Sequence, residues 1–402
     1  MTLESPAAMS RSERKATLVL AALFALRMFG MFVILPVFAL YAEGLPGGHD
    51  RVLAGIALGA YGLTQALLQI PFGYASDRFG RKPAIIVGLV VFAAGSAVAA
   101  IAPNIGWTIV GRALQGAGAI SAAVLAFTAD VTRAEVRTRA MAVIGMSIGA
   151  TFALSLVAGP LLQHAVGVPG IFALTGALAL AGIALVLRLP EVKAPERVAP
   201  RLAGLSVIVS DAQLLRLNYG IFALHAVLMA LFVQVPFALR DAGLPAGAQW
   251  KVYLPVLVLA AAVVVPLLRH ADRAAGGKGI FNAGVVVLAM GQLLLAVAGS
   301  LPMLVAGLAV FFVGFCLLEA TLPALVSKFA PPAWRGTAVG VYSTLQFFGA
   351  FVGATAGGAL AQFAGATAVF GFGLVLTLAW LAASATMAAL PAYHSNYSMG
   401  ET

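Results

Sequence analysis

Twelve apolar segments, each about as long as a bilayer-spanning helix, occupy most of this chain of 402 residues. A helix needs roughly 20 predominantly apolar residues to cross the hydrocarbon core. Hydrophobic residues make up 62% of the chain and charged residues only 9%, which is too much apolar surface for a soluble fold to cover. The sequence therefore predicts an all-α integral membrane protein with twelve transmembrane helices. The predicted spans are 16–41, 52–75, 83–102, 105–129, 138–163, 168–189, 214–239, 251–269, 279–299, 301–327, 335–362 and 366–389.

The basic residues are distributed unevenly between the two sides of this topology. With the N-terminus inside, nineteen of the 24 Lys and Arg residues lie in inner segments, three lie in outer loops and two lie within spans. Cytoplasmic loops carry such an excess of positive charge, so both termini are predicted to be cytoplasmic, in a bacterial-type inner membrane. The net charge of +10 arises from these short loops rather than from a basic patch, and no nucleic-acid partner is expected.

Residues 190–213 form the longest polar connection and are predicted to be a cytoplasmic linker. They separate an N-terminal six-helix half, residues 1–189, from a C-terminal six-helix half, residues 214–402. A faint repeat supports this division, because the Pro-x5-Asp-Arg pattern of residues 71–78 recurs at 266–273. Two six-helix halves with a binding site between them are a recognised plan of secondary transporters. Such a chain can work as a monomer.

A glycine-rich and strongly charged motif stands between predicted spans two and three, where residues 73–82 read GYASDRFGRK. Its first glycine allows close helix approach, and its second permits a tight turn. One acid and three basic residues form a compact charge cluster at the inner face of the membrane. The residues of this predicted gating motif are Gly73, Asp77, Arg78, Gly80, Arg81 and Lys82.

With this motif the chain resembles the major facilitator superfamily over nearly its whole length. More narrowly, it is similar to the twelve-span drug:proton antiporters and to the YajR group within them. Residues 111–116, with Arg112, Gln115 and Gly116, are similar to the Arg-x2-Gln-Gly motif of span four in that family. Gly159 and Pro160 match the helix-packing centre of its antiporter motif in span five. Ser155 and Gln163 stand where that motif usually has glycines, which weakens the inference of antiport.

The resemblance implies an ion-pair relay at the inner gate. In the family, the acid and the second arginine of the loop motif pair with an acid at the inner end of helix four, and here these residues are Asp77, Arg81 and Asp130. The family's motif acid also faces the start of helix eleven, near Trp334 to Gly336 in this chain, where the helix dipole favours a carboxylate. A degraded copy in the second half, Asp272-Arg273 with Lys278, is expected to have a weaker role.

Four ionisable residues lie inside apolar spans, one on each of the spans that line the central cavity in the resembled family. They are Arg27, Arg112, His225 and Glu319. A charge in the bilayer core costs at least about 2.5 kcal/mol and normally faces a cavity or a partner. Glu319 is the leading candidate for a proton carrier, with Arg112 and His225 as further proton-coupling residues.

Each of these assignments has a structural alternative. Glu319 could form a permanent ion pair with an arginine across the halves, Arg112 could serve as scaffold, and His225 could be a packing histidine. Arg27 is predicted to line the substrate cavity, together with Gln115 and Gln234, although it could instead bind a backbone carbonyl.

The predicted function is proton-coupled export of small lipophilic or drug-like molecules by alternating access, driven by the proton gradient, with no cofactor and no metal. Sugars, organic anions or other metabolites remain alternative cargoes. A membrane enzyme acting on lipid would need a nucleophile or metal constellation near Glu319 and His225, and the sequence offers neither. A sensor or proton-leak role is a further alternative. The sequence contains no Gly-x4-Gly-Lys-Ser/Thr loop, which argues against an ATP-driven pump.

Overall fold

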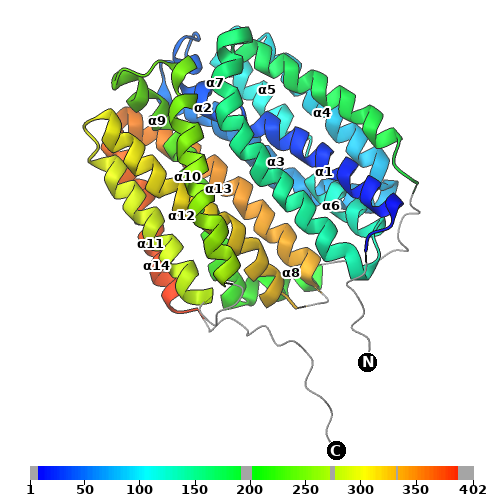
Figure 1. The fold of residues 1–402 in the computed structure, drawn as a ribbon. Helices are drawn as coiled ribbons and strands as arrows, with labels where there is room; N and C mark the ends of the chain where they lie inside the picture. Colours follow the sequence, from blue (N-terminus) through cyan, green and yellow to red (C-terminus); the bar gives the residue numbers. More distant parts are fainter. Residues whose placement is uncertain (1–7, 192–201, 272–276, 332–333, 388–402) are drawn as a thin grey trace, which may run out of the picture.

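The computed structural model describes residues 8–191, 202–271, 277–331 and 334–387, and all regular elements in these ranges are helices. Eleven of the described helical segments are long and apolar enough to cross a membrane, and the longest, Glu135–Leu187, contains two of the predicted spans. The prediction of a twelve-span, all-α membrane protein is therefore confirmed (Figure 1).

The helices form two groups that lie side by side in Figure 1. The first half consists of α1 (Arg11–Phe32), α2 (Leu35–Glu43), α3 (Arg51–Phe79), α4 (Arg81–Ala100), α5 (Ile105–Ala117), α6 (Ser121–Asp130) and α7 (Ala134–Leu187). After α8 (Leu202–Ser210), the second half consists of α9 (Ala212–Asp241), the 3-10 turn η1 (Ala246–Ala248), α10 (Trp250–Ala271), α11 (Gly277–Ala296), α12 (Leu301–Phe329), α13 (Arg335–Phe363) and α14 (Ala366–Ala385). We call the end where α1 begins and α14 ends the terminal face, and the other end the opposite face.

Two predicted spans are interrupted by local breaks, and two others join into one bent helix. The first span divides into α1 and α2 near Val33, just before Pro36, which suits the first turn of a new helix. The fourth span divides into α5 and α6 at Gly118. The fifth and sixth spans join as α7, which bends at Gly167, where φ is +68° and only glycine is free of strain.

Two sequence-based boundaries differ from the structure. The motif at 73–82 was predicted to be a loop, but α3 continues to Phe79 and α4 begins at Arg81, so that only Gly80 separates them. The predicted polar linker contains α8, because residues 202–210 (LAGLSVIVS) are predominantly apolar. The indole ring of Trp334 packs against Gly204 of this helix.

The two halves pack closely near the opposite face and diverge toward the terminal face. A Cβ atom on Gly55 or Gly62 of α3 would lie 2.3 or 2.6 Å from a carbonyl oxygen of α13, so backbone meets backbone there. Gly340 and Gly336 continue the same side of α13 toward the terminal face, because they precede Phe347 by seven and eleven residues. A Cβ atom at either glycine would meet nothing within 4 Å.

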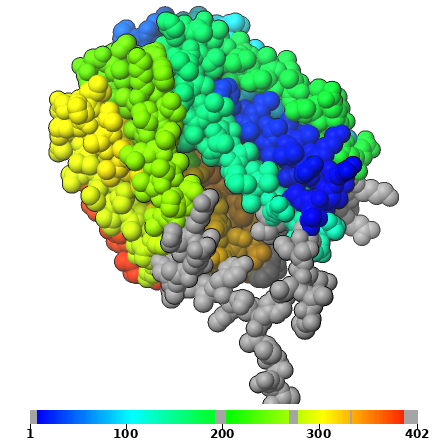
Figure 2. Space-filling view, in the orientation of Figure 1, coloured from blue at the N-terminus to red at the C-terminus, as the bar shows by residue number. Residues whose placement is uncertain are grey.

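Four phenylalanines from both halves close the middle of the molecule. The ring centroid of Phe152 on α7 lies 5.1 Å from Phe32, 6.2 Å from Phe312 and 5.5 Å from Phe315. We call these four residues the aromatic layer. Gly149, one turn from Phe152 toward the terminal face, again has open space beside it. A cleft between the halves therefore opens to the terminal face, and Figure 2 shows the surface hollowed between α7 and α10 on that side.

Candidate functional site

The cleft contains a carboxylate and an imidazole from two different helices of the second half. Glu319 lies one turn after Phe315 on α12, on the terminal side of the aromatic layer, and its side chain is 30% exposed. Its Oε2 atom lies 3.9 Å from Nε2 of His225 on α9, which is buried. Nε2 of Gln346 on α13 lies 2.8 Å from the same histidine nitrogen. Helices α9, α12 and α13 thus converge on one polar cluster.

The surroundings of Glu319 distinguish between the two sequence-based hypotheses for this residue. Among the described residues, no ion pair joins Glu319 to an arginine, and its Oε2 atom has no hydrogen-bond partner. The hydroxyl group of Tyr342, one turn before Gln346 on α13, is also buried without a hydrogen-bond partner in that set. The carboxyl group is therefore placed to exchange a proton or to meet a ligand that enters the cleft.

Arg27 and Arg112 lie in the interior of the first half, away from the cleft. Both side chains are almost completely buried, and their Cζ atoms lie 5.6 and 4.9 Å from the ring centroid of Tyr61 on α3. Arg27 donates to Ser121 at 2.8 Å and to Gln65. The described ion pairs give neither arginine a carboxylate, so an aromatic face and side-chain oxygens stabilise two buried cations.

The predicted cavity residues are thus separated in space. Gln115 is completely buried, accepts a hydrogen bond from Arg112 at 2.8 Å and donates one to Ser96 at 2.8 Å. Gln234 lies near the opposite face, where Arg51 donates to it at 3.5 Å. In this conformation, Arg27, Gln115 and Gln234 do not line the open cleft, and their contact with substrate stays a prediction.

The gating motif forms a closed charge cluster at the terminal face. The guanidinium group of Arg81 contacts Oδ1 of Asp77 at 2.5 Å, Oδ2 of Asp130 at 2.7 Å and Oγ of Ser76 at 3.0 Å. Arg81 is buried, whereas the two carboxylates are 28% and 23% exposed. One arginine therefore ties the ends of α3 and α6 to the start of α4, which brings together the three residues of the predicted relay.

The remaining motif residues shape this corner. Gly80 has a φ of +99°, which a residue with a Cβ atom rarely adopts, and it makes the one-residue turn between α3 and α4. A Cβ atom on Gly73 would sit 3.5 Å from Ala122 of α6. The guanidinium group of Arg78 stacks 5.4 Å from the ring centroid of Phe79. Lys82 lines a cavity of about 440 Å³ at the terminal face.

The helix-packing motif lies where α7 crosses the break in the first span. A Cβ atom on Gly159 would lie 2.3 Å from the carbonyl oxygen of Val33 and 2.9 Å from Cγ of Pro36. Pro160 is buried beside it. The glycine is therefore required for backbone contact between these helices.

Part of the degraded motif copy lies outside the described residues, namely Asp272 and Arg273. Its third member, Lys278, donates to the carbonyl oxygens of Ala385 and Met387 and so caps the end of α14. Contact between Asp77 and the start of α13, near Trp334 to Gly336, stays a prediction.

Sequence reasoning did not identify the aromatic layer, Tyr61 or a second ion pair at the terminal face. Glu13 on α1 accepts hydrogen bonds from the backbone nitrogen and Nε of Arg133, both at 3.0 Å, and this carboxylate raises the pKa of the Arg133 guanidinium. An acid inside the capping box that begins with Ser10 was the available signal.

Comparison with known proteins agrees with this architecture. Residues 20–354 match the Major Facilitator Superfamily, and the chain belongs to that family. It is therefore a secondary transporter of a small-molecule substrate rather than an enzyme. The chain is 44% identical over 385 residues to "Inner membrane transport protein YajR" of Escherichia coli K12, covering 94% of this chain and 84% of that protein. Like that relative, it is a multi-pass protein of the inner membrane.

More distant relatives share the fold. "Multidrug resistance protein MdtH" of Aeromonas hydrophila is 28% identical over 345 residues, covering 84% of this chain and 85% of that protein. A crystal structure of a D-xylose-proton symporter superimposes with a TM-score of 0.73 at 18% identity, covering 94% and 99% of the two chains. The human organic anion transporter MFSD10 superimposes with a TM-score of 0.72 at 20% identity, covering 93% and 100%.

Proposed function

We propose that this transporter exports small lipophilic, drug-like molecules in exchange for protons, with Glu319 as the proton carrier. The observation that carries the proposal is the position of Glu319, on the terminal side of the aromatic layer and exposed to the cleft. The multidrug name of the 28% identical relative supports the cargo class. Both termini are assigned to the cytoplasm, because the basic loops lie on that side.

The coupling follows from the cost of enclosing a charge. An ionised carboxylate in a dry site is expensive, so the empty, ionised carrier does not close around Glu319 readily. A proton or a cationic substrate neutralises the carboxylate and lowers that cost, and each then favours the change of orientation. His225, whose Nε2 atom lies 3.9 Å from Oε2 of Glu319, is the second titratable group at this site. This scheme produces one-for-one exchange without a direct contact between substrate and proton.

The gating cluster has a separate role in this scheme. Arg81 with Asp77 and Asp130 fixes the corner of the first half that borders the cleft entrance. When the terminal face closes, this corner docks against the second half and holds the outward-open state. The two six-helix halves, residues 1–189 and 214–402, move as units about the aromatic layer, and a monomer is sufficient.

The alternative cargo is an organic anion or another metabolite. The observation that favours it is the pair of buried arginines in the first half, Arg27 and Arg112, which have no carboxylate partner among the described residues. The positive electrostatic field of these two guanidinium groups attracts a negatively charged substrate toward the centre of the molecule.

A thermal-shift screen of the purified protein against cationic, neutral and anionic compounds tests the cargo class. A ligand that binds the folded state raises its melting temperature by mass action. Lipophilic cations are expected to stabilise the wild type, and Glu319→Gln is expected to weaken that stabilisation without removing it. Glu135→Gln, a change at an exposed acid outside the cleft, serves as the control. Stabilisation by anions alone, unchanged in Glu319→Gln, would replace the drug:proton proposal with the anion alternative.

A further inference from the structure

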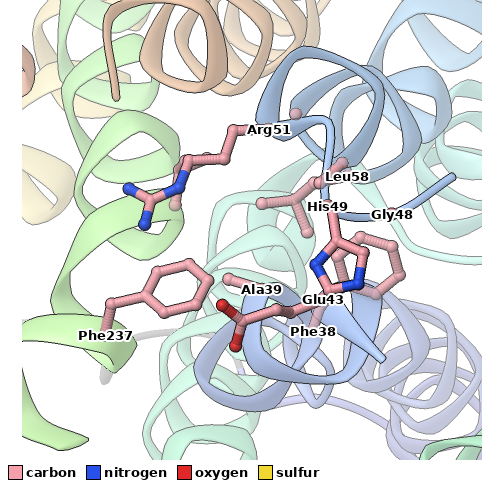
Figure 3. A pocket seen from close by; sticks show the side chains of 11 residues that line it. Phe38, Ala39, Glu43, Gly48, His49, Arg51, Leu58 and Phe237 are labelled. Atoms are coloured by element: carbon pink, nitrogen blue, oxygen red, sulfur yellow. The ribbon is translucent and has the colours of Figure 1, made fainter. Parts of the chain in front are cut away.

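Near the opposite face, a phenylalanine of one half lies between arginines of both halves. Phe237 on α9 is buried, and its ring centroid lies 4.8 Å from Cζ of Arg51 on α3 and 5.1 Å from Cζ of Arg240 on α9. Figure 3 shows Phe237 and Arg51 reaching toward each other from different helices. Because an arginine attracts the face of an aromatic ring, the contact between Arg51 and Phe237 links the two halves.

Polar contacts extend this arrangement on both sides. Nη1 of Arg240 lies 2.7 Å from Oε2 of Glu43 on α2, a residue of the first half, and its Nε lies 3.0 Å from Asp241. Nη1 of Arg51 donates to Oε1 of Gln234 on α9 at 3.5 Å. Three contacts, from Glu43 to Arg240, from Arg51 to Phe237 and from Arg51 to Gln234, therefore cross between the halves.

The space enclosed by these residues is too small for a substrate. The pocket in Figure 3, which Glu43, Arg51 and Phe237 line, has an interior volume of about 20 Å³. A cavity needs about 10–15 Å³ to hold one water molecule, so the pocket accommodates a water molecule at most. These side chains consequently close the opposite face between the two halves and do not form a substrate-binding site.

We infer that Glu43, Arg51, Phe237 and Arg240 form a clasp that holds the opposite face shut while the cleft is open at the terminal face. Every cross-half contact of the clasp breaks when the halves separate at this face, whereas the pairing of Arg240 with Asp241 persists within α9. Arg240 thus keeps one carboxylate partner in either state, which lowers the cost of opening. The inference rests on the alternating-access cycle proposed above and on none of its proton or substrate chemistry.

Distance measurements between two spin labels at the opposite face test the clasp. The label sites are Ile101 at the end of α4 and Phe363 at the end of α13, both highly exposed and outside the clasp. They are changed to cysteine in a Cys316→Ala background, because Cys316 is the only cysteine of the chain. The distances are recorded in lipid nanodiscs, without substrate and at one pH, so that a failure of proton coupling or of the cargo assignment does not affect the result.

Phe237→Leu and Arg240→Gln are expected to raise the ratio of wide to narrow distances, each on the order of tenfold, because each removes cross-half contacts. Phe237→Tyr keeps the ring and is expected to leave the ratio unchanged. Phe281→Leu removes a buried ring that packs on Trp380 within the second half and controls for general loosening. Unchanged distances in both clasp variants, with wild-type thermal stability, would overturn the clasp, and so would an equal shift in Phe281→Leu.

Discussion

Oε2 of Glu319 and Nε2 of His225 lie 3.9 Å apart, on two helices of the same half, where the cleft reaches the aromatic layer. Neither residue pairs with an arginine within the described part of the chain. The only acid deep in a predicted span is thus accessible from one side of the molecule and separated from the other side by packed phenylalanine rings. That asymmetry is what an alternating-access carrier needs at its proton site.

Packing at the helix-crossing glycine yields the first prediction. Gly159→Ala places a Cβ atom 2.3 Å from the Val33 carbonyl oxygen, and because backbone must move, the substitution is expected to lower the free energy of unfolding by about 1–3 kcal/mol. Gly145→Ala on the same helix meets nothing within 4 Å and is expected to be neutral or stabilising by up to about 1 kcal/mol. Thermal unfolding in detergent compares them. Equal destabilisation by both variants would refute the close contact.

Arg81 of the gating cluster yields the second prediction. Arg81→Ala leaves Asp77 and Asp130 without their shared cation, and it is expected to lower the free energy of unfolding by about 2–3 kcal/mol. This value lies at the lower end for a broken buried ion pair, because both carboxylates are partly exposed. Arg81→Lys is expected to recover only part of this loss, since an ammonium group lacks the planar fork that reaches both acids. Arg78→Ala, at an exposed neighbour, is the control and should change stability by less than about 0.5 kcal/mol. A small effect of Arg81→Ala, equal to that of the control, would contradict the geometry.

Tyr61 yields the third prediction, which separates its ring from its hydroxyl group. The hydroxyl group has no hydrogen-bond partner among the described residues, so Tyr61→Phe should alter stability by less than about 1 kcal/mol. Tyr61→Leu removes the aromatic face from two buried arginines and should cost about 2–4 kcal/mol. Chemical unfolding curves in detergent measure both. If Tyr61→Leu were as mild as Tyr61→Phe, the ring would not stabilise Arg27 and Arg112.

The global fold could be predicted from the sequence because span length and loop charge are properties of the whole chain. The interior of the first half could not. Arg112 and Gln115 lie in a motif that the family resemblance links to the cavity, yet they face Tyr61 and Ser96 inside the half. The sequence shows that these polar residues share one helix, but whether they face the cavity or the interior of the half depends on how α5 packs against α3 and α4.

The pairing within the site was predictable only where a short motif specified it. Asp77 and Arg81 are four residues apart at the end of one helix and the start of the next, and Asp130 follows from the resemblance. The proximity of His225 to Glu319, by contrast, depends on the packing of α9 against α12. The two residues lie far apart in the sequence, so no local sequence pattern predicts their contact. The clasp at Phe237 was not found for the same reason, because its members come from three separate helices.

Proton flux in proteoliposomes that contain a pH-sensitive dye, with a stabilising compound from the thermal-shift screen added outside, tests Glu319 as the proton carrier most directly. In the wild type, the compound is expected to drive protons in the direction opposite to its own movement. Glu319→Gln should abolish proton movement while it retains exchange of labelled for unlabelled compound, because a permanently neutral side chain still permits reorientation. Glu135→Gln should behave as the wild type. Substrate-driven proton movement that persists undiminished in Glu319→Gln would contradict the assignment of Glu319 as the proton carrier.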